Sequence, residues 1–99
     1  MYLISKDGKS VVNMNHVTVI YMTSNCTLNA DTISGRGSGL GNYGTTEDVR
    51  MAIRMVSEKI GKSEVARMPS DDEVRARKRM EEERHHNKAG RKTKGHGGS

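Results

Sequence analysis

The segment from Thr45 to Ile60 constrains the fold more than any other part of the chain. Its apolar residues recur at steps of three and four, which places them on one face of an α-helix: Val49, Ala52, Ile53, Val56 and Ile60. Thr45 can cap the first turn and Asp48 adds negative charge there, while Gly61 suits the left-handed residue that often ends a helix. We therefore expect an amphipathic helix that covers a small sheet.

The residues before this helix predict the sheet. Asp7-Gly8 favours a tight turn, and residues 17–22 are the richest stretch in β-branched and aromatic residues. Glycine-rich residues 35–44 predict a mobile loop that leads into a short strand. The fold class we expect is α+β: an antiparallel β-meander of four or five strands, one packed helix and a charged C-terminal helix. Strands are expected near residues 2–5, 11–14, 17–22, 26–31 and 40–43, and residues 65–68 are a candidate for a last edge strand.

A second helix is predicted from Asp71 to about Asn87. Ser70 and Glu73 have the spacing of a capping box, and Glu73–Arg77 is the best-oriented i,i+4 ion pair. The helix has few apolar residues, so it should be solvated or docked on a charged partner. The Gly- and Lys-rich tail after it is expected to be disordered when free. The predicted units are residues 1–69, 70–87 and 88–99.

Positive charge is concentrated at the C-terminal end. The net charge is +5, but residues 1–73 hold eight basic and nine acidic side chains, whereas residues 74–99 hold nine basic and three acidic ones. We call the nine basic residues the basic arm: Arg75, Arg77, Lys78, Arg79, Arg84, Lys88, Arg91, Lys92 and Lys94. Such a run can bind phosphates without reading base sequence, or it can simply be a solubilising tail.

Other sequence features have two interpretations. Met51 and Met55 lie off the apolar stripe and form either an adaptable partner-binding surface or the flank of the core. The glycines of residues 39–44 match G-x-G-x-x-G before a helix, a pattern that can cradle a phosphate, but no parallel βαβ unit is predicted around them. The alternative for this segment is a flexible linker.

The sequence pattern predicts neither a catalytic centre nor a metal site. His85 and His86 follow Glu81 and Glu82 by four residues, yet no second cluster completes a metal site, so a solvated helix end is the simpler interpretation. His16 has no nucleophile beside it in any known local signature. We expect no enzymatic activity, no cofactor and no metal.

The composition indicates the cellular compartment of the protein and whether it needs a partner for stability. The single Cys26 cannot form an internal disulfide, and neither a signal peptide nor a membrane span is visible, which together favour the cytoplasm. Phe and Trp are absent, and a core made mainly of aliphatic residues and Met in so short a chain is marginal. Homo-oligomerisation or a bound partner would stabilise it.

The order of these pieces resembles small, mostly uncharacterised accessory proteins encoded by phages and prophages of Gram-positive bacteria. The resemblance lies in short stretches between residues 4 and 74: Ile4-Ser5-Lys6-Asp7-Gly8-Lys9, Asn15-His16-Val17, Leu40-Gly41-Asn42-Tyr43 leading into Thr46-Glu47, and Met68-Pro69-Ser70-Asp71-Asp72-Glu73-Val74. It implies a compact sheet with one helix and a role in a phage's dealings with its host cell, and no functional residue is carried over from it. The basic extension after Val74 departs from the family pattern.

The function we expect is non-enzymatic binding of a host protein in the host cytoplasm, and its specific form would be inhibition of a nucleic-acid-guided defence nuclease. The alternative is sequence-independent nucleic-acid binding through the basic arm.

Overall fold

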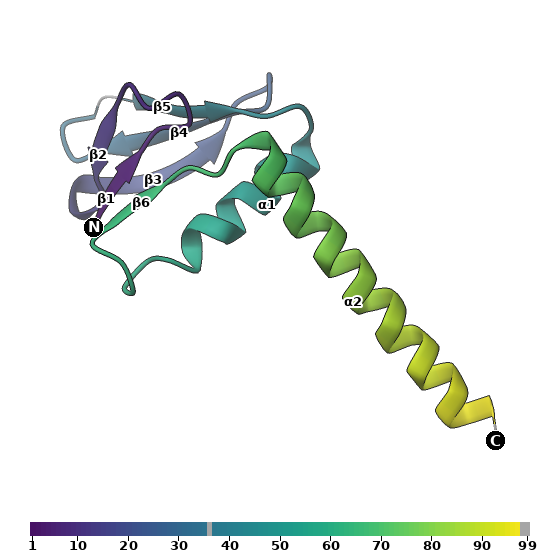
Figure 1. Cartoon of the computed structure of the whole chain (residues 1–99). Coiled ribbons are helices and arrows are strands. Elements are labelled where there is room, and N and C mark those ends of the chain that lie inside the picture. Colours follow the sequence, from purple (N-terminus) through teal and green to yellow (C-terminus); the bar gives the residue numbers. More distant parts are fainter. Residues whose placement is uncertain (36, 98–99) are drawn as a thin grey trace.

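A computed structural model of the chain describes residues 1–35 and 37–97, with side chains described as far as Arg84. The fold is α+β, as the sequence predicts, with two helices and two three-stranded sheets (Figure 1). In chain order the elements are β1 (Tyr2–Ile4), β2 (Val11–Asn13), a 3₁₀ turn (Met14–His16), β3 (Val17–Met22), β4 (Thr27–Thr32), β5 (Gly37–Asn42), α1 (Thr46–Ser57), β6 (Val65–Arg67) and α2 (Asp71–Gly97).

The strands form two sheets where the sequence predicts one antiparallel meander, so that part of the prediction is wrong. β3, β4 and β5 are an antiparallel meander, while β1 pairs antiparallel with β2 and parallel with β6. β6 lies more than 60 residues from β1 in the sequence, and local patterns carry no information about such a pairing. The two sheets meet where the Lys6 backbone N–H donates to the carbonyl of Leu40, 2.7 Å away.

The glycine-rich segment is a strand over most of its length, which corrects the expectation of a mobile loop. β5 spans Gly37–Asn42 and pairs with β4 through a register shift between Leu28 and Asn29. Glycine has low strand propensity, but β5 is held on one edge by β4 and on the other by the Lys6 backbone. Tertiary pairing therefore overrides local preference here.

Helix α1 begins as predicted. The side chain of Thr45 accepts a hydrogen bond from the backbone N–H of Asp48, 3.1 Å away, and Gly61 has a φ of +81° in the turn that follows the helix. The helix buries its apolar face in a single core made of Leu3, Val12, Leu28, Ala30, Leu40, Tyr43, Val49, Met51, Ala52, Val56, Ala66, Met68 and Val74.

The predicted apolar stripe is only partly buried. Val49, Ala52 and Val56 are core residues, whereas Ile53 remains 37% exposed and Ile60 52% exposed. Helix α1 ends at Ser57, so Ile60 lies in the turn beyond it. Periodicity identified the apolar side of the helix but not how much of that side the sheet covers.

Helix α2 starts at its predicted capping box and projects away from the sheets (Figure 1). The Ser70 backbone N–H donates to the Glu73 carboxylate at 3.0 Å, and the Glu73 N–H donates to the Ser70 hydroxyl at 3.1 Å. Because Glu73 is held in this box, the predicted Glu73–Arg77 pair does not form, and Arg77 binds other carboxylates.

The helix also runs further than predicted, to Gly97 rather than to about Asn87. Arg, Lys and Ala favour helix, no proline intervenes, and each interior glycine costs only roughly 1 kcal/mol. Of the tail predicted to be disordered, residues 98–99 lie outside the described residues. In the described part of the chain, no helix combines the length and the apolar character needed to cross a bilayer.

Candidate functional site

The basic arm divides into a proximal part that packs on α1 and a distal part beyond Arg84. Up to Arg84, α2 carries five basic and six acidic residues, so this half of the helix is not a positive surface. Residues 85–97 contain four basic residues and no acidic one. The positive charge that the sequence assigns to the whole arm is therefore concentrated in its last turns.

Arg77 is the centre of a charged network between the two helices. Its Nη1 donates to Glu58 at 2.9 Å, its Nη2 also bonds to that carboxylate, and its Nε donates to Glu81 at 3.0 Å. Arg54 of α1 binds the same Glu81 through two bonds of 2.9 and 3.1 Å. The hydrogen bond from Arg77 lowers the pKa of Glu58 below its usual value. Arg77 is thus held in the structure and is not available to a phosphate.

Lys78 is the second contact between α2 and α1. Its Nζ lies 2.8 Å from Asp48 and 3.9 Å from Glu47, both in the first turn of α1. The bond to Asp48 raises the pKa of Lys78. Together with the buried side chain of Val74, these ion pairs fix the direction in which α2 leaves the module.

The remaining proximal residues differ in their partners. Arg75 pairs with Asp72 of its own helix. Arg79 and Arg84 are exposed and make no ion pair within the described part of the chain. Of Arg75, Lys78 and Arg79, which lie within about one turn of α2, only Arg79 is unpaired within the described residues, so the three do not form a free phosphate-binding stripe.

The distal basic residues cannot be assessed at the level of side chains. The helix backbone continues through these positions, but the side chains lie outside those that the structure describes: Lys88, Arg91, Lys92 and Lys94. Figure 1 shows this part of α2, in yellow-green to yellow, far from both sheets. The molecule extends 60 Å along its longest axis against 29 and 20 Å across it.

The two methionines proposed as a contact surface lie at the flank of the core, which was the alternative interpretation. Met51 is 8% exposed and belongs to the core, and Met55 packs against it while partly buried. Little of Met51 is left to contact another molecule.

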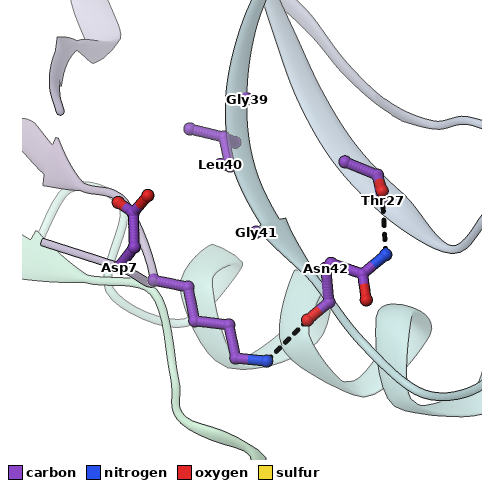
Figure 2. A pocket seen from close by; sticks show the side chains of 7 residues that line it. Asp7, Thr27, Gly39, Leu40, Gly41 and Asn42 are labelled. Carbon is purple, nitrogen blue, oxygen red and sulfur yellow. Dashed lines mark hydrogen bonds between the residues drawn. The ribbon is translucent and has the colours of Figure 1, made fainter. Parts of the chain in front are cut away.

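An open hollow of about 560 Å³ lies between the turn after β1 and strand β5 (Figure 2). The Lys6 Nζ donates to the Asn42 carbonyl at 2.5 Å and to Asp71 at 2.8 Å, and lies 4.3 Å from the centre of the Tyr43 ring. The Asn42 amide in turn donates to the Thr27 hydroxyl at 2.9 Å. Lys6 and Asn42 are therefore engaged by groups of the chain itself, and their bonds tie the turn after β1 to β4, β5 and α2.

The G-x-G-x-x-G pattern does not form a phosphate cradle at a helix start. Its first two glycines lie inside β5, and α1 is capped by the threonine that follows the last one. A Cβ added at Gly41 would lie 2.8 Å from the Cβ of Lys6, so this glycine permits a close crossing of two chain segments. The pattern therefore has a packing explanation.

The remaining candidate residues for metal binding or catalysis are the histidines and the carboxylates. Among the side chains described, no three His, Cys, Asp or Glu gather where they could hold a metal ion. His85 and His86 belong to the side chains that the structure leaves undescribed, so the Glu–His pairing stays a sequence expectation. His16 ends the 3₁₀ turn before β3, and its carbonyl accepts a bond from the backbone N–H of Ile33 at 2.9 Å.

Sequence analysis missed the acidic partners that hold α2. Asp48 was identified only as a first-turn charge, and neither Glu58 nor Arg54 was identified at all. The available signal was an Arg followed four residues later by a Glu in both places, Arg54–Glu58 at the end of α1 and Arg77–Glu81 on α2. Comparison of the chain with protein-family models, curated proteins and solved structures gives no match.

Proposed function

We propose that this chain is a non-enzymatic binding protein that uses the projecting α2 helix to engage a macromolecular partner. One observation carries this proposal: α2 has 27 residues, its ion pairs with the module among the described side chains lie between Asp71 and Glu81, and the rest of the helix projects away from the module (Figure 1). A stiff helix held at one end by buried and ionic contacts is a pre-organised docking element.

A protein partner is the first candidate. Along the proximal half of α2, acidic and basic side chains occur in successive blocks of similar size, which suits a charged protein surface better than a phosphate backbone. The resemblance to phage accessory proteins extends this proposal to a host protein, and inhibition of a nucleic-acid-guided defence nuclease would be its specific form. The distal helix would then enter the groove in which such a nuclease holds its nucleic acid.

The test is a binding experiment with two variants of equal charge. The arm variant replaces the four distal basic residues by Gln, and the control variant does the same at four exposed basic residues of the module: Arg50, Lys59, Lys62 and Arg67. A lysate of a Gram-positive host, treated with nuclease, is passed over each protein at physiological salt. We expect the wild type and the control to retain the same host protein and the arm variant to lose it. Equal retention by all three would refute docking through distal α2.

Direct nucleic-acid binding is the second candidate, now assigned to the distal part of α2. Four basic residues without an acidic neighbour over residues 85–97 favour it. Since the chain has no Trp or Phe and all three of its Tyr lie before residue 44, the arm has none of these rings on which bases could stack, and binding should be independent of base sequence.

A mobility-shift assay with the same variants distinguishes the two candidates. If the arm binds duplex DNA, log K should fall with log salt at a slope of about 0.9 per neutralised phosphate, and the arm variant should lose most of that slope. The control should keep it. No shift of DNA at low salt would leave the protein partner as the remaining candidate.

A further inference from the structure

Strand β3 is an unprotected edge of the antiparallel sheet. Its neighbour on one side is β4, and no backbone hydrogen bond among the described residues crosses its other side. The Thr23 N–H donates to the Thr27 carbonyl at 2.8 Å at the end of this hairpin. The alternation of an antiparallel ladder then directs the N–H and C=O groups of Ile20 and Met22 away from β4.

The other sheet edges are protected and β3 is not. β2 and β6 are three residues long, and the free edge of β5 is met by the Lys6 backbone. β3 has six residues, and residues 10–30 contain no Lys, Arg, Asp or Glu. Proteins normally shield an edge strand by shortening it or by adding charge, so a long uncharged edge is a site for pairing.

Apolar side chains flank this edge on both faces. On the outer face Val19 is 48% exposed and Tyr21 is 37% exposed. On the inner face Met22, opposite Leu28, is 41% exposed. Beside them, Ile20, Ile53 and Ile60 line a small apolar crevice of about 60 Å³ between the sheet and α1.

We propose that β3 pairs antiparallel with β3 of a second copy of this chain, which forms a continuous six-stranded sheet with both α1 helices on one face. An antiparallel strand is complementary to its own copy about a two-fold axis. A register centred on Tyr21 places Ile20 opposite Met22 of the second copy. The exposed Ile53 and Ile60 of the two copies then meet across the axis.

The charge distribution favours a second copy over a charged partner. The β3 edge carries no charge with which to select a charged partner. The charged contacts between α1 and α2 lie on the flank of α1 opposite to Ile53 and Ile60. The two basic arms therefore leave the pairing edge clear. The five exposed side chains and the strand edge offer roughly 500 Å² per copy, or about 1,000 Å² in total, which reaches the lower limit of specific interfaces. Because buried area does not fix the affinity, the test must cover a wide range of concentration.

The test is the mass of the full chain in solution as a function of concentration. By sedimentation equilibrium we expect the 10.9 kDa chain to approach twice that mass as the concentration rises to about 500 µM. Met22→Lys places a charge on the pairing edge and should keep the chain monomeric. The matched control Val65→Lys, on the edge strand β6 where Val65 is 58% exposed, should dimerise like the wild type.

Two further measurements distinguish loss of the dimer contact from misfolding of a variant. Ile60→Lys alters a side chain that is 52% exposed and outside every helix and strand, so it should weaken the dimer without harming the fold. The amides of Ile20 and Met22 should exchange more slowly at high concentration than at low concentration. A wild type that stays at 10.9 kDa throughout, or a Val65→Lys variant that dissociates as fully as Met22→Lys, would overturn the proposal.

Discussion

Replacing Tyr43 by Phe tests how the module holds the start of α2. Tyr43 is 2% exposed, and its hydroxyl donates a 2.7 Å hydrogen bond to the buried carbonyl of Pro69, directly before the cap of α2. Burial and the nearby carboxylates of Asp71 and Glu73 raise the pKa of Tyr43 above that of a free tyrosine, so the phenol stays protonated and keeps donating.

The substitution keeps the ring but leaves this carbonyl without its partner. An unsatisfied buried acceptor costs about 1–3 kcal/mol, and in a domain of this size 1 kcal/mol lowers Tm by roughly 4–8 °C. We therefore expect Tyr43→Phe to lower Tm by about 4–24 °C in thermal unfolding followed by circular dichroism. The control is Tyr2→Phe, since Tyr2 is 50% exposed and its hydroxyl makes no hydrogen bond within the described residues.

Equal melting of the two variants would refute the assigned role of the Tyr43 hydroxyl. A urea titration adds a second criterion, because a lost hydrogen bond lowers the midpoint while the m-value stays constant.

Three further outcomes are expected. Gly41→Ala should destabilise the fold by about 1–3 kcal/mol, because its Cβ would lie 2.8 Å from a lysine Cβ, while Gly39→Ala, with 3.9 Å to its nearest neighbour, should cost less in the same urea titration. Arg77→Ala should lower Tm more than Arg79→Ala in thermal unfolding, since only Arg77 binds two carboxylates and links the helices. The pKa of Glu73 is lowered by its bond from the Ser70 N–H, so the unfolded chain binds more protons; stability is fully present above about pH 5 and is lost as pH falls. Glu73→Gln can still accept that bond but cannot titrate, so its acid unfolding curve should be flatter than that of the wild type.

The structure also changes where the chain should be cut to test the arm. Removal of residues 75–99, which contain the whole basic arm, would delete Arg77 and Lys78 and so disturb the packing of α1. A chain that ends after Arg84 keeps both ion pairs and, of the basic arm, removes only the four distal residues. That truncation is the better companion to the charge variants.

Local features of the fold were readable from the sequence. The caps of α1 and α2, the span of β3 and the left-handed Gly8 depend on groups within a few residues of one another, and each is where the sequence places it. Steric limits and short-range hydrogen bonds determine such features, so neighbouring residues suffice to predict them.

Tertiary structure alone decided how these pieces combine. The parallel pairing of β1 with β6, the choice of Glu58 as a partner of Arg77, and the exposure of Ile53 all depend on segments brought together from distant parts of the chain. Periodicity states which side of a helix is apolar, and residue type states which groups carry charge. Neither states which surface will lie opposite, because that depends on the packing of the whole chain.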